Sequence, residues 1–189
     1  MSATLLEESL NNFDFFWNWL QKATSNSKHP FRYPTVVTSQ NGLPNARTMV
    51  LRDVIGYKLI FFTDLRSPKV GELQQNPNAC IHIYDSKKRT QIIVKGTVSI
   101  VQDHPKMKIW KDAGQRHPND YTSSQPPSRP LSENDDIEFI ANSFDEYFGV
   151  LSVDINCVEI LHLQKTMHQR WCWKRKSNGT NWKKTQFVP

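Results

Sequence analysis

The chain has 189 residues, enough for one domain with a hydrophobic core. Aromatic residues make up 11% of it, which excludes a disordered tail. The formal net charge of +6 permits an anionic partner, such as nucleic acid, a membrane surface or a phosphorylated cofactor. No long run of like charges marks a basic nucleic-acid arm.

The N-terminal segment predicts an amphipathic helix from about Leu5 to Lys22. An aromatic stripe at its i, i+3, i+4 and i+7 positions is typical of core or dimer packing rather than of cofactor contact. The stripe consists of Phe13, Phe16, Trp17 and Leu20.

The lack of a recognisable signal peptide or membrane span, together with the cysteine pattern, predicts a cytoplasmic protein. The first residues carry acids and lack the basic and apolar regions of a signal peptide. No apolar run approaches the length that spans a bilayer. The odd number of cysteines and the absence of C-x-x-C spacing predict reduced core residues at Cys80, Cys157 and Cys172.

Five β-rich segments with short connections follow the helix. Asn41-Gly42 predicts a hairpin turn, and Asp53 to Gly56 predicts a second turn. This pattern is typical of an antiparallel barrel, so we expect a mainly β fold with flanking helices (α+β). The predicted strands are Tyr33–Ser39, Thr48–Leu51, Tyr57–Thr63, Ala79–Tyr84 and Gln91–Ile100.

A short helix is predicted after the third strand. Ser67 suits the N-cap, where its hydroxyl can bond a free N–H group, and Pro68 suits the first helical position. Val70 and Leu73 would face inward, and the Asn76-Pro77 pair ends the helix.

Three cations lie at the edges of these elements, and they are Arg47, Arg52 and Lys69. Lys69 in the first helical turn opposes the helix dipole, which favours anions there by ~0.3–1 kcal/mol. An anion shared by Lys69 and the free helix N–H groups would remove that conflict. The spacing therefore fits a phosphate site, and it fits a set of solvated surface charges equally well.

Two more helices and a long polar loop are predicted next. The first helix runs from about His104 to Asp112, with Asp103 as N-cap. The region Gly114 to Pro130 is long for a loop in a compact domain and suggests a lid, a binding loop or an ordered arm. Ser132 and Asp135 resemble a capping box that opens the second helix. Its expected apolar face is Ile137, Ile140, Phe144 and Phe148.

The last third of the chain is β-rich, with Asn178-Gly179 as the turn of a final hairpin. Trp171 to Lys176 interleaves aromatic and basic residues, which suits either base stacking or packing at a dimer interface, and we favour packing. No Walker loop, dinucleotide fingerprint, catalytic triad or metal-ligand cluster is recognised. The predicted strands are Gly149–Ile155, Cys157–Leu163, His168–Arg175 and Trp182–Val188.

The motifs between Arg47 and Gln91 resemble, in order and spacing, the FMN-binding core of the pyridoxamine 5′-phosphate oxidase family. They are Arg47 to Arg52, Phe61-Phe62-Thr63, Ser67-Pro68-Lys69, Asn76-Pro77 and Arg89-Thr90-Gln91. The resemblance covers about Tyr33 to Pro189, and its later matches are Gln125, His168, Arg170 and Phe187-Val188-Pro189.

This resemblance implies an FMN-binding split β-barrel of one domain (1–189). Its parts are an N-terminal helix (1–30), a barrel core (31–101), helices with a polar loop (102–148) and C-terminal strands (149–189). It implies an FMN-dependent oxidoreductase whose flavin accepts a hydride from a small amine, phosphorylated or not, or from another small-molecule substrate. The enzyme would work as a homodimer with FMN at the subunit interface, without nucleic acid or a membrane. The cofactor-binding residues implied are Arg47, Thr48, Met49, Val50, Leu51, Arg52, Phe62, Thr63, Ser67, Lys69, Gln91, Gln125 and Arg170.

Within that set, Arg47 and Lys69 would neutralise the FMN phosphate, and Thr63 and Ser67 would add hydroxyl groups. Gln91 and Gln125 would bond the ring or the ribityl chain. Arg52 would put positive charge near the N1–C2 side of the flavin. The catalytic residues implied are His168, Arg170 and Arg52.

The chain departs from the family mainly where the oxidase holds its substrate. Arg52 replaces a lysine, Pro68 replaces an arginine, Thr166 replaces an arginine, and Leu161 falls near a tryptophan. The 114–130 loop lacks the family's substrate-phosphate clamp. These departures predict tight FMN binding and poor oxidation of pyridoxamine 5′-phosphate. A split barrel that binds flavin or haem without turnover stays open as an alternative, as does a basic nucleic-acid-binding barrel.

Overall fold

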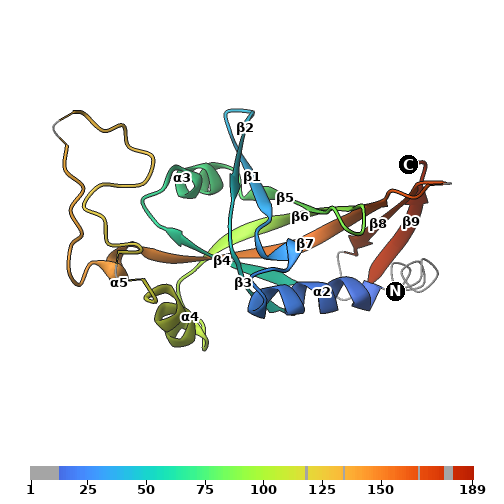
Figure 1. Cartoon of the computed structure of the whole chain (residues 1–189), viewed down its shortest axis with the longest axis horizontal. Helices are drawn as coiled ribbons and strands as arrows, with labels where there is room; N and C mark the ends of the chain where they lie inside the picture. The colour runs from blue at the N-terminus through green and yellow to red at the C-terminus, as the bar shows by residue number, and fades with distance from the viewer. Residues whose placement is uncertain (1–12, 118, 134, 166, 177–180) are drawn as a thin grey trace.

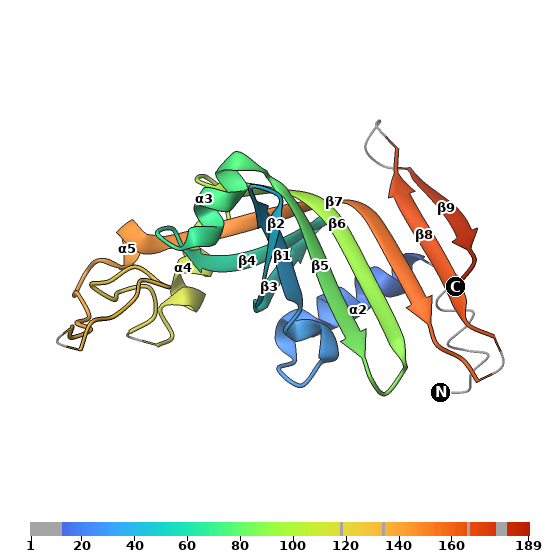
Figure 2. The same ribbon diagram turned by 90° about the horizontal axis from the view of Figure 1, so that it is seen from above.

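The computed structural model describes residues 13–117, 119–133, 135–165, 167–176 and 181–189. One antiparallel sheet organises them (Figures 1 and 2). Its strands run in the order β2-β1-β5-β6-β7-β4-β3, and β8 pairs with β7 while β9 pairs with β8. The strands are β1 (Thr35–Gln40), β2 (Leu43–Thr48), β3 (Leu51–Ile55), β4 (Lys58–Asp64), β5 (Asn78–Asp85), β6 (Thr90–Val101), β7 (Phe148–His162), β8 (Gln169–Arg175) and β9 (Trp182–Phe187).

Short helices flank this sheet. They are α2 (Phe13–Ser25), the 3₁₀ turn η1 (Pro30–Arg32), α3 (Pro68–Gln75), α4 (Met107–Gly114) and α5 (Phe144–Tyr147). The architecture is mainly antiparallel β with a few helices, as the sequence predicts. Among the described helices, none is long and apolar enough to cross a membrane.

The β1–β2 hairpin turns at Asn41 (φ 51°) and Gly42 (φ 82°), which confirms the predicted turn. The predicted strand Thr48–Leu51 is wrong. Pairing with β1 ends at Thr48, and pairing with β4 begins at Leu51. At that crossing the Met49 N–H donates to the Pro34 carbonyl over 3.0 Å. Local β propensity does not show this change of partner.

The turn predicted over Asp53 to Gly56 is also wrong. Strand β3 continues to Ile55, and the chain turns at Gly56 (φ 55°) and Tyr57. The register of β3 against β4 shifts between Leu51 and Asp53, so Arg52 is the extra residue of a bulge.

Strand β7 joins two predicted strands into one of 15 residues. Lys95 pairs with Cys157 and Gly96 pairs with Ile155, so Asn156 is an extra residue that bulges without ending the strand. A Cβ atom on Gly96 would lie 2.6 Å from the Asp154 carbonyl oxygen, so glycine is required opposite this bulge.

The main core includes residues of α2 and of the sheet strands, and Figure 2 shows α2 running beside the sheet. Phe16 and Leu20 of the predicted stripe are buried, and Phe13 and Trp17 pack against them. The predicted helix start lies outside the described residues, and α2 ends at Ser25 rather than Lys22.

Trp171 and Trp173 of β8 belong to this core, with 4% and 3% of their surface exposed. The Phe13 and Trp173 ring centroids lie 5.5 Å apart. Buried indoles cannot stack on bases, so the base-stacking alternative is wrong for this segment. The predicted final turn, Asn178-Gly179, lies outside the described residues.

Helix α4 begins three residues later than predicted. Lys106, not Asp103, is its N-cap, and the Lys106 N–H donates to His104 Nδ1 over 3.1 Å. Trp110 is buried in a second core cluster, which lies against the β4–β7 part of the sheet. The cluster comprises Ile60, Phe62, Trp110, Phe144, Phe148 and Val150.

The helix predicted from Ser132 is wrong. The Ser132 N–H does donate to Asp135 over 2.9 Å, as a capping box requires, but only α5 is helical. Segment 138–140 pairs with segment 122–124 instead, through Ser124 N–H to Glu138 O (2.7 Å) and Ile140 N–H to Thr122 O (2.8 Å). The described residues between 115 and 143 thus form an irregular arm, which projects at one end of the molecule in Figure 1.

Candidate cofactor site

A group of polar side chains gathers where β4 ends and α3 begins. Lys69 Nζ donates to Ser67 Oγ over 2.8 Å and to Thr63 Oγ1 over 3.2 Å. Thr63 and Ser67 are both 3% exposed. We call Arg47, Thr63, Ser67 and Lys69 the anion cluster.

Ser67 is the N-cap residue of α3 with Pro68 after it, as predicted, but its hydroxyl makes no capping bond. The hydroxyl donates instead to the Asp64 carbonyl over 2.6 Å. The expected N-cap hydrogen bond is therefore wrong. Pro68 has no N–H, and the Val70 N–H donates to the Ser67 carbonyl over 2.9 Å, so the Lys69 N–H is the first-turn donor left for another acceptor. The inward Val70 and Leu73 and the end of α3 before Asn76 are confirmed.

Positive charge is concentrated in the anion cluster. Burial lowers the pKa of Lys69 below its ordinary value, and the nearby Arg47 lowers it further. Two cations beside a helix N-terminus repel one another and oppose the helix dipole. A phosphate would relieve both effects, and it could accept hydrogen bonds from the Lys69 ammonium, the Arg47 guanidinium and the Lys69 N–H.

Glu72 is a member of this site that sequence reasoning missed. Its side chain lies one turn after Lys69 and is buried, with 3% of its surface exposed. It accepts hydrogen bonds from Asn45 (2.9 Å), Arg47 (3.1 Å) and Thr38. The i, i+3 spacing from Lys69 was its only signal, because the strands that α3 contacts cannot be read locally.

The predicted segment Thr48 to Leu51 follows Arg47 directly. Met49 and Leu51 are buried in the core, so only backbone atoms are left for a ligand there, while Thr48 is exposed. The bulge at Arg52 aims its guanidinium over the Phe62 ring, 5.0 Å from the centroid. Arg52 Nε is buried and lacks a hydrogen-bond partner among the described residues.

Tyr121, in the arm, faces the same arginine. Burial raises the pKa of its phenol, while the charge of Arg52 and a hydrogen bond with it act in the opposite direction. Arg52 and Tyr121 thus bring together β3 and the arm beside the second core cluster.

Gln91 and Arg170 lie on the other face of the sheet from Arg47. Arg47 is in register with Val36, Ile81 and Val94, which are core residues. Gln91 precedes the core residue Ile92, and β strands alternate faces. Register aligns Gln91 with Leu161 and Leu161 with Arg170, and we call these three residues the outer-face row.

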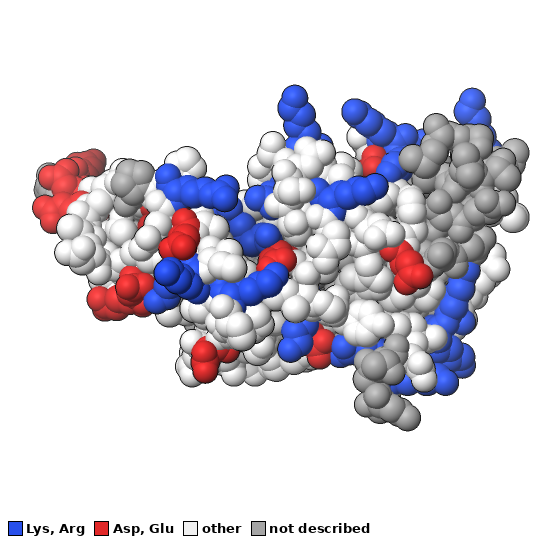
Figure 3. Space-filling view, turned by 90° about the horizontal axis from the view of Figure 1, so that it is seen from below, with Lys and Arg blue, Asp and Glu red and all other residues white. Residues whose placement is uncertain are grey.

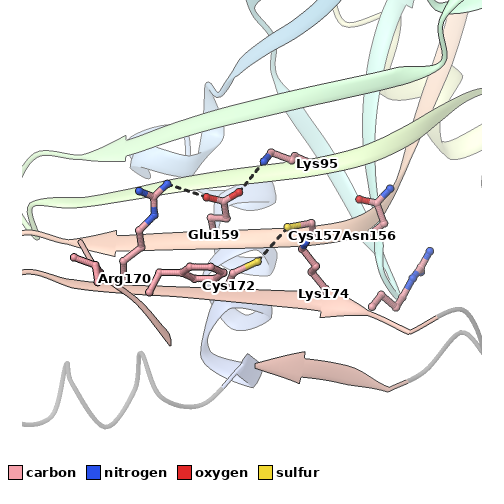
Figure 4. Close-up of a pocket in the computed structure, with 10 residues that line it drawn as sticks. Lys95, Asn156, Cys157, Glu159, Arg170, Cys172 and Lys174 are labelled. Atoms are coloured by element: carbon pink, nitrogen blue, oxygen red, sulfur yellow. Dashed lines mark hydrogen bonds and ion pairs between the residues drawn. The ribbon is translucent and has the colours of Figure 1, made fainter. Parts of the chain in front are cut away.

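A cavity of about 670 Å³ lies beside the outer-face row. Glu159 there accepts hydrogen bonds from Lys95 (2.7 Å) and Arg170 (3.0 Å), as Figure 4 shows. The hydrogen bond from Lys95 lowers the pKa of Glu159, and burial opposes this effect. Arg170 is therefore held by a carboxylate rather than free.

The cysteines are reduced, as predicted, and Cys157 and Cys172 are buried while Cys80 is half-buried. The Sγ atoms of Cys157 and Cys172 lie 3.4 Å apart beside the same cavity. Burial and the hydrogen bond with Cys172 raise the pKa of Cys157 to about 12, so this thiol does not supply a thiolate at neutral pH.

The remaining predicted residues are spread along the molecule. His168 is exposed ahead of β8, and Gln125 lies in the arm, where it accepts a hydrogen bond from Arg129. Thr166 lies outside the described residues. Figure 1 shows the arm and the β8–β9 hairpin at opposite ends, so one chain does not bring Gln125 to Arg170.

Lys and Arg side chains are interspersed with Asp and Glu over the face drawn in Figure 3. This mixed face offers no continuous basic stripe for a nucleic-acid backbone. The described residues contain no group of three or more His, Cys, Asp or Glu that could hold a metal ion.

Comparison with known proteins tests the predicted family resemblance. Residues 14–102 match the sequence profile of the pyridoxamine 5′-phosphate oxidase FMN-binding domain. These residues therefore confirm the predicted resemblance to the pyridoxamine 5′-phosphate oxidase-related FMN-binding family. The predicted fold, an FMN-binding split barrel, and the predicted cofactor, FMN, are thereby confirmed.

Individual relatives are similar over different spans. A pyridoxine/pyridoxamine 5′-phosphate oxidase of Leptospira interrogans is 30% identical over 88 residues, covering 46% of this chain and 41% of that one. The oxidase of Deinococcus deserti is 24% identical over 165 residues, covering 86% of this chain and 77% of that one. The chain thus spans less than half the length of the first of these relatives.

Two solved structures share the fold. A pyridoxamine 5′-phosphate oxidase-related, FMN-binding protein of Nostoc punctiforme has a TM-score of 0.71 at 25% identity, covering 94% of this chain and 96% of that one. PhzG of Burkholderia lata, in complex with tetrahydrophenazine-1-carboxylic acid, has a TM-score of 0.69 at 17% identity, covering 93% and 91%. The donors of the anion cluster fit the phosphate of FMN.

Proposed function

We propose that this chain is an FMN-dependent oxidoreductase of a small substrate, with its cofactor between two copies of the chain. The observation that carries the proposal is the anion cluster. Two cations and two hydroxyls lie there beside the first turn of α3, and a terminal phosphate would neutralise the cations and accept from the Lys69 ammonium and the Arg47 guanidinium.

The phosphate half of the site comes from one chain. Lys69 acts as a point charge, and Arg47 presents planar N–H donors. Thr48 to Leu51 line the approach through their backbone, and Phe62 and Arg52 lie further along. Arg52 would lie toward the N1–C2 side of the ring, where its charge favours the reduced flavin.

The ring half comes from the second copy. Gln91 and Arg170 lie on the opposite sheet face from Arg47, and Gln125 lies at the far end of the chain from Arg170. A two-fold homodimer in which facing copies exchange these side chains would complete the site. We propose the dimer on this ground.

When bound, FMN supplies the two-electron redox chemistry, and the protein contributes position and charge. His168 and Arg170 would face the substrate, and Glu159 would orient Arg170. The natural substrate is proposed as a small amine or a related molecule, since the family's substrate-phosphate positions are replaced. The single-domain division and a cytoplasmic location stay predictions.

Flavin titration tests the proposal directly. The apoprotein is titrated with FMN and with riboflavin, and quenching of flavin fluorescence is followed. We expect FMN to bind about tenfold more tightly or better, because each charge-assisted hydrogen bond to phosphate contributes ~1.5–3 kcal/mol. Equal affinity for the two flavins would sink the assignment of the anion cluster.

A non-catalytic flavin-binding protein is the second candidate. It is favoured by the exposure of His168 and by the lost substrate clamp. Hydrogen peroxide release from a panel of small amines, with FMN bound, separates the two candidates. Bound FMN without turnover on any of them would favour the second.

A further inference from the structure

Glu72 is the one carboxylate in direct contact with the anion cluster among the described residues. Burying a carboxylate is costly unless it is paired and hydrogen-bonded. Its Oε1 accepts from Asn45, and its Oε2 accepts from Arg47 and Thr38, so both oxygens are occupied. These contacts join α3 to the β1–β2 hairpin.

Two hydrogen bonds hold the Arg47 guanidinium, one to Glu72 and one to Thr38. Its Nη2 donates to Glu72 over 3.1 Å, and its Nη1 donates to the Thr38 hydroxyl, which itself donates to Glu72. A guanidinium has five N–H donors in a fixed plane, so two contacts on one side fix the direction of those that remain. Lys69, on the same helix as Glu72, lies close enough to Arg47 for the guanidinium charge to lower its pKa.

We infer that Glu72 is a positioning residue for phosphate recognition, acting through Arg47. The inference rests on the proposed function, because it assigns the ligand of the anion cluster as the FMN phosphate. A held guanidinium loses little conformational entropy when the phosphate binds, and this gain would favour FMN over riboflavin.

Two other roles for Glu72 make different predictions. As a competitor for Arg47, its negative charge would repel the phosphate, and any neutral substitute would tighten FMN binding. As a purely structural link between α3 and the hairpin, it would affect the stability of the fold without affecting the ratio of FMN to riboflavin affinity.

Two substitutions separate these roles. Glu72→Gln removes the charge but keeps an acceptor for Arg47, and its amide group can donate to a reoriented Asn45. Glu72→Met fills a similar volume without any acceptor for Arg47. We expect Glu72→Met to lower the FMN-to-riboflavin affinity ratio about tenfold or more, and Glu72→Gln to stay within about threefold of the unchanged chain.

An Arg47→Ala background tests whether Glu72 acts through Arg47. There we expect Glu72→Met to have no further effect on the ratio. Asp154→Leu is the matched control, since Asp154 holds Arg175 over 2.7 and 2.9 Å outside the anion cluster. It should leave the ratio unchanged. Circular dichroism establishes that each variant is folded.

If Glu72→Met does not fold, Thr38→Val gives a second test, because it removes the hydroxyl between Arg47 and Glu72 at nearly constant volume. It should lower the ratio in the same direction. The inference would be overturned by an unchanged ratio in folded Glu72→Met, or in Thr38→Val if Glu72→Met does not fold. Tighter FMN binding in Glu72→Met, or an equal loss in the Arg47→Ala background, would overturn it as well. A lack of FMN preference in the unchanged chain would instead sink the proposed function itself.

Discussion

The two halves of the proposed flavin site differ in how complete one chain makes them. The anion cluster and Glu72 form a closed hydrogen-bond network. Glu72 of α3 accepts from Asn45 and Arg47 of β2, and Lys69 donates to Ser67. The outer-face row lies on an open sheet face, and the side chain of Arg170 is 38% exposed.

This difference suits the different needs of the phosphate and of the flavin ring. A phosphate carries fixed charge and needs donors in fixed positions, so its site is built within one folding unit. The flavin ring is large and apolar, and burying it takes surfaces from two sides. On the proposed function, a single chain would supply the affinity for FMN, and a second copy would supply the environment in which chemistry occurs.

The largest expected effect comes from a substitution in the phosphate half of the site. Lys69→Ala should weaken FMN binding about 10- to 150-fold, because it removes a charge-assisted contact of ~1.5–3 kcal/mol, and riboflavin binding should hardly change. Fluorescence titration measures both affinities. Lys111→Ala, which removes an exposed pair with Asp145, is the control and should behave like the unchanged chain.

Mixing two defective chains tests the shared site. Lys69→Ala damages the phosphate half, and Arg170→Ala damages the ring half. Random reassociation would pair intact halves in about a quarter of the sites, because half the dimers are mixed and each mixed dimer holds one intact site. Turnover should therefore return on mixing. No recovery, or a monomer by light scattering with flavin bound, would count against a shared site.

The ring half should affect turnover more than binding. His168→Ala is expected to keep FMN bound, because the histidine is exposed and distant in sequence from the anion cluster, and to lower only the rate. With pyridoxamine 5′-phosphate, the unchanged chain should stay below about 10⁴ M⁻¹s⁻¹ in kcat/KM, since the substrate-phosphate clamp is replaced. Steady-state peroxide assays check both expectations. A higher efficiency would show that the departures are compensated.

The smallest expected effect is a pH dependence of FMN affinity. Affinity should rise as pH passes about 6, where the phosphate takes its second negative charge. It should fall again in the alkaline range, because Lys69 loses its proton there. Burial and Arg47 lower the pKa of Lys69, so in the free protein this fall begins below the ordinary lysine range. The Lys69→Ala variant should not show this alkaline fall in FMN affinity. The same fall in that variant would mean that a group other than Lys69 causes it.

Much of the site could be read from the sequence. The order Arg47, Thr63, Ser67, Lys69 gives residue types that suit phosphate, and the structure brings all four together. Glu72 was missed because its role depends on Thr38 and Asn45, which reach it from another hairpin. The helix predicted from Ser132 failed because pairing between segments 122–124 and 138–140 replaced the helical hydrogen bonds.

The sequence by itself determined the β-rich class, the α3 start at Ser67-Pro68 and the hairpin at Asn41-Gly42, because these depend on periodicity and on φ preferences of a few adjacent residues. Only the tertiary structure decided that Asn156 bulges within one long strand, that the chain changes partner at Met49, and that Gln91 and Arg47 lie on opposite sheet faces. Strand register fixes these features, and register depends on hydrogen bonds between segments far apart in the chain, which no local window of sequence contains.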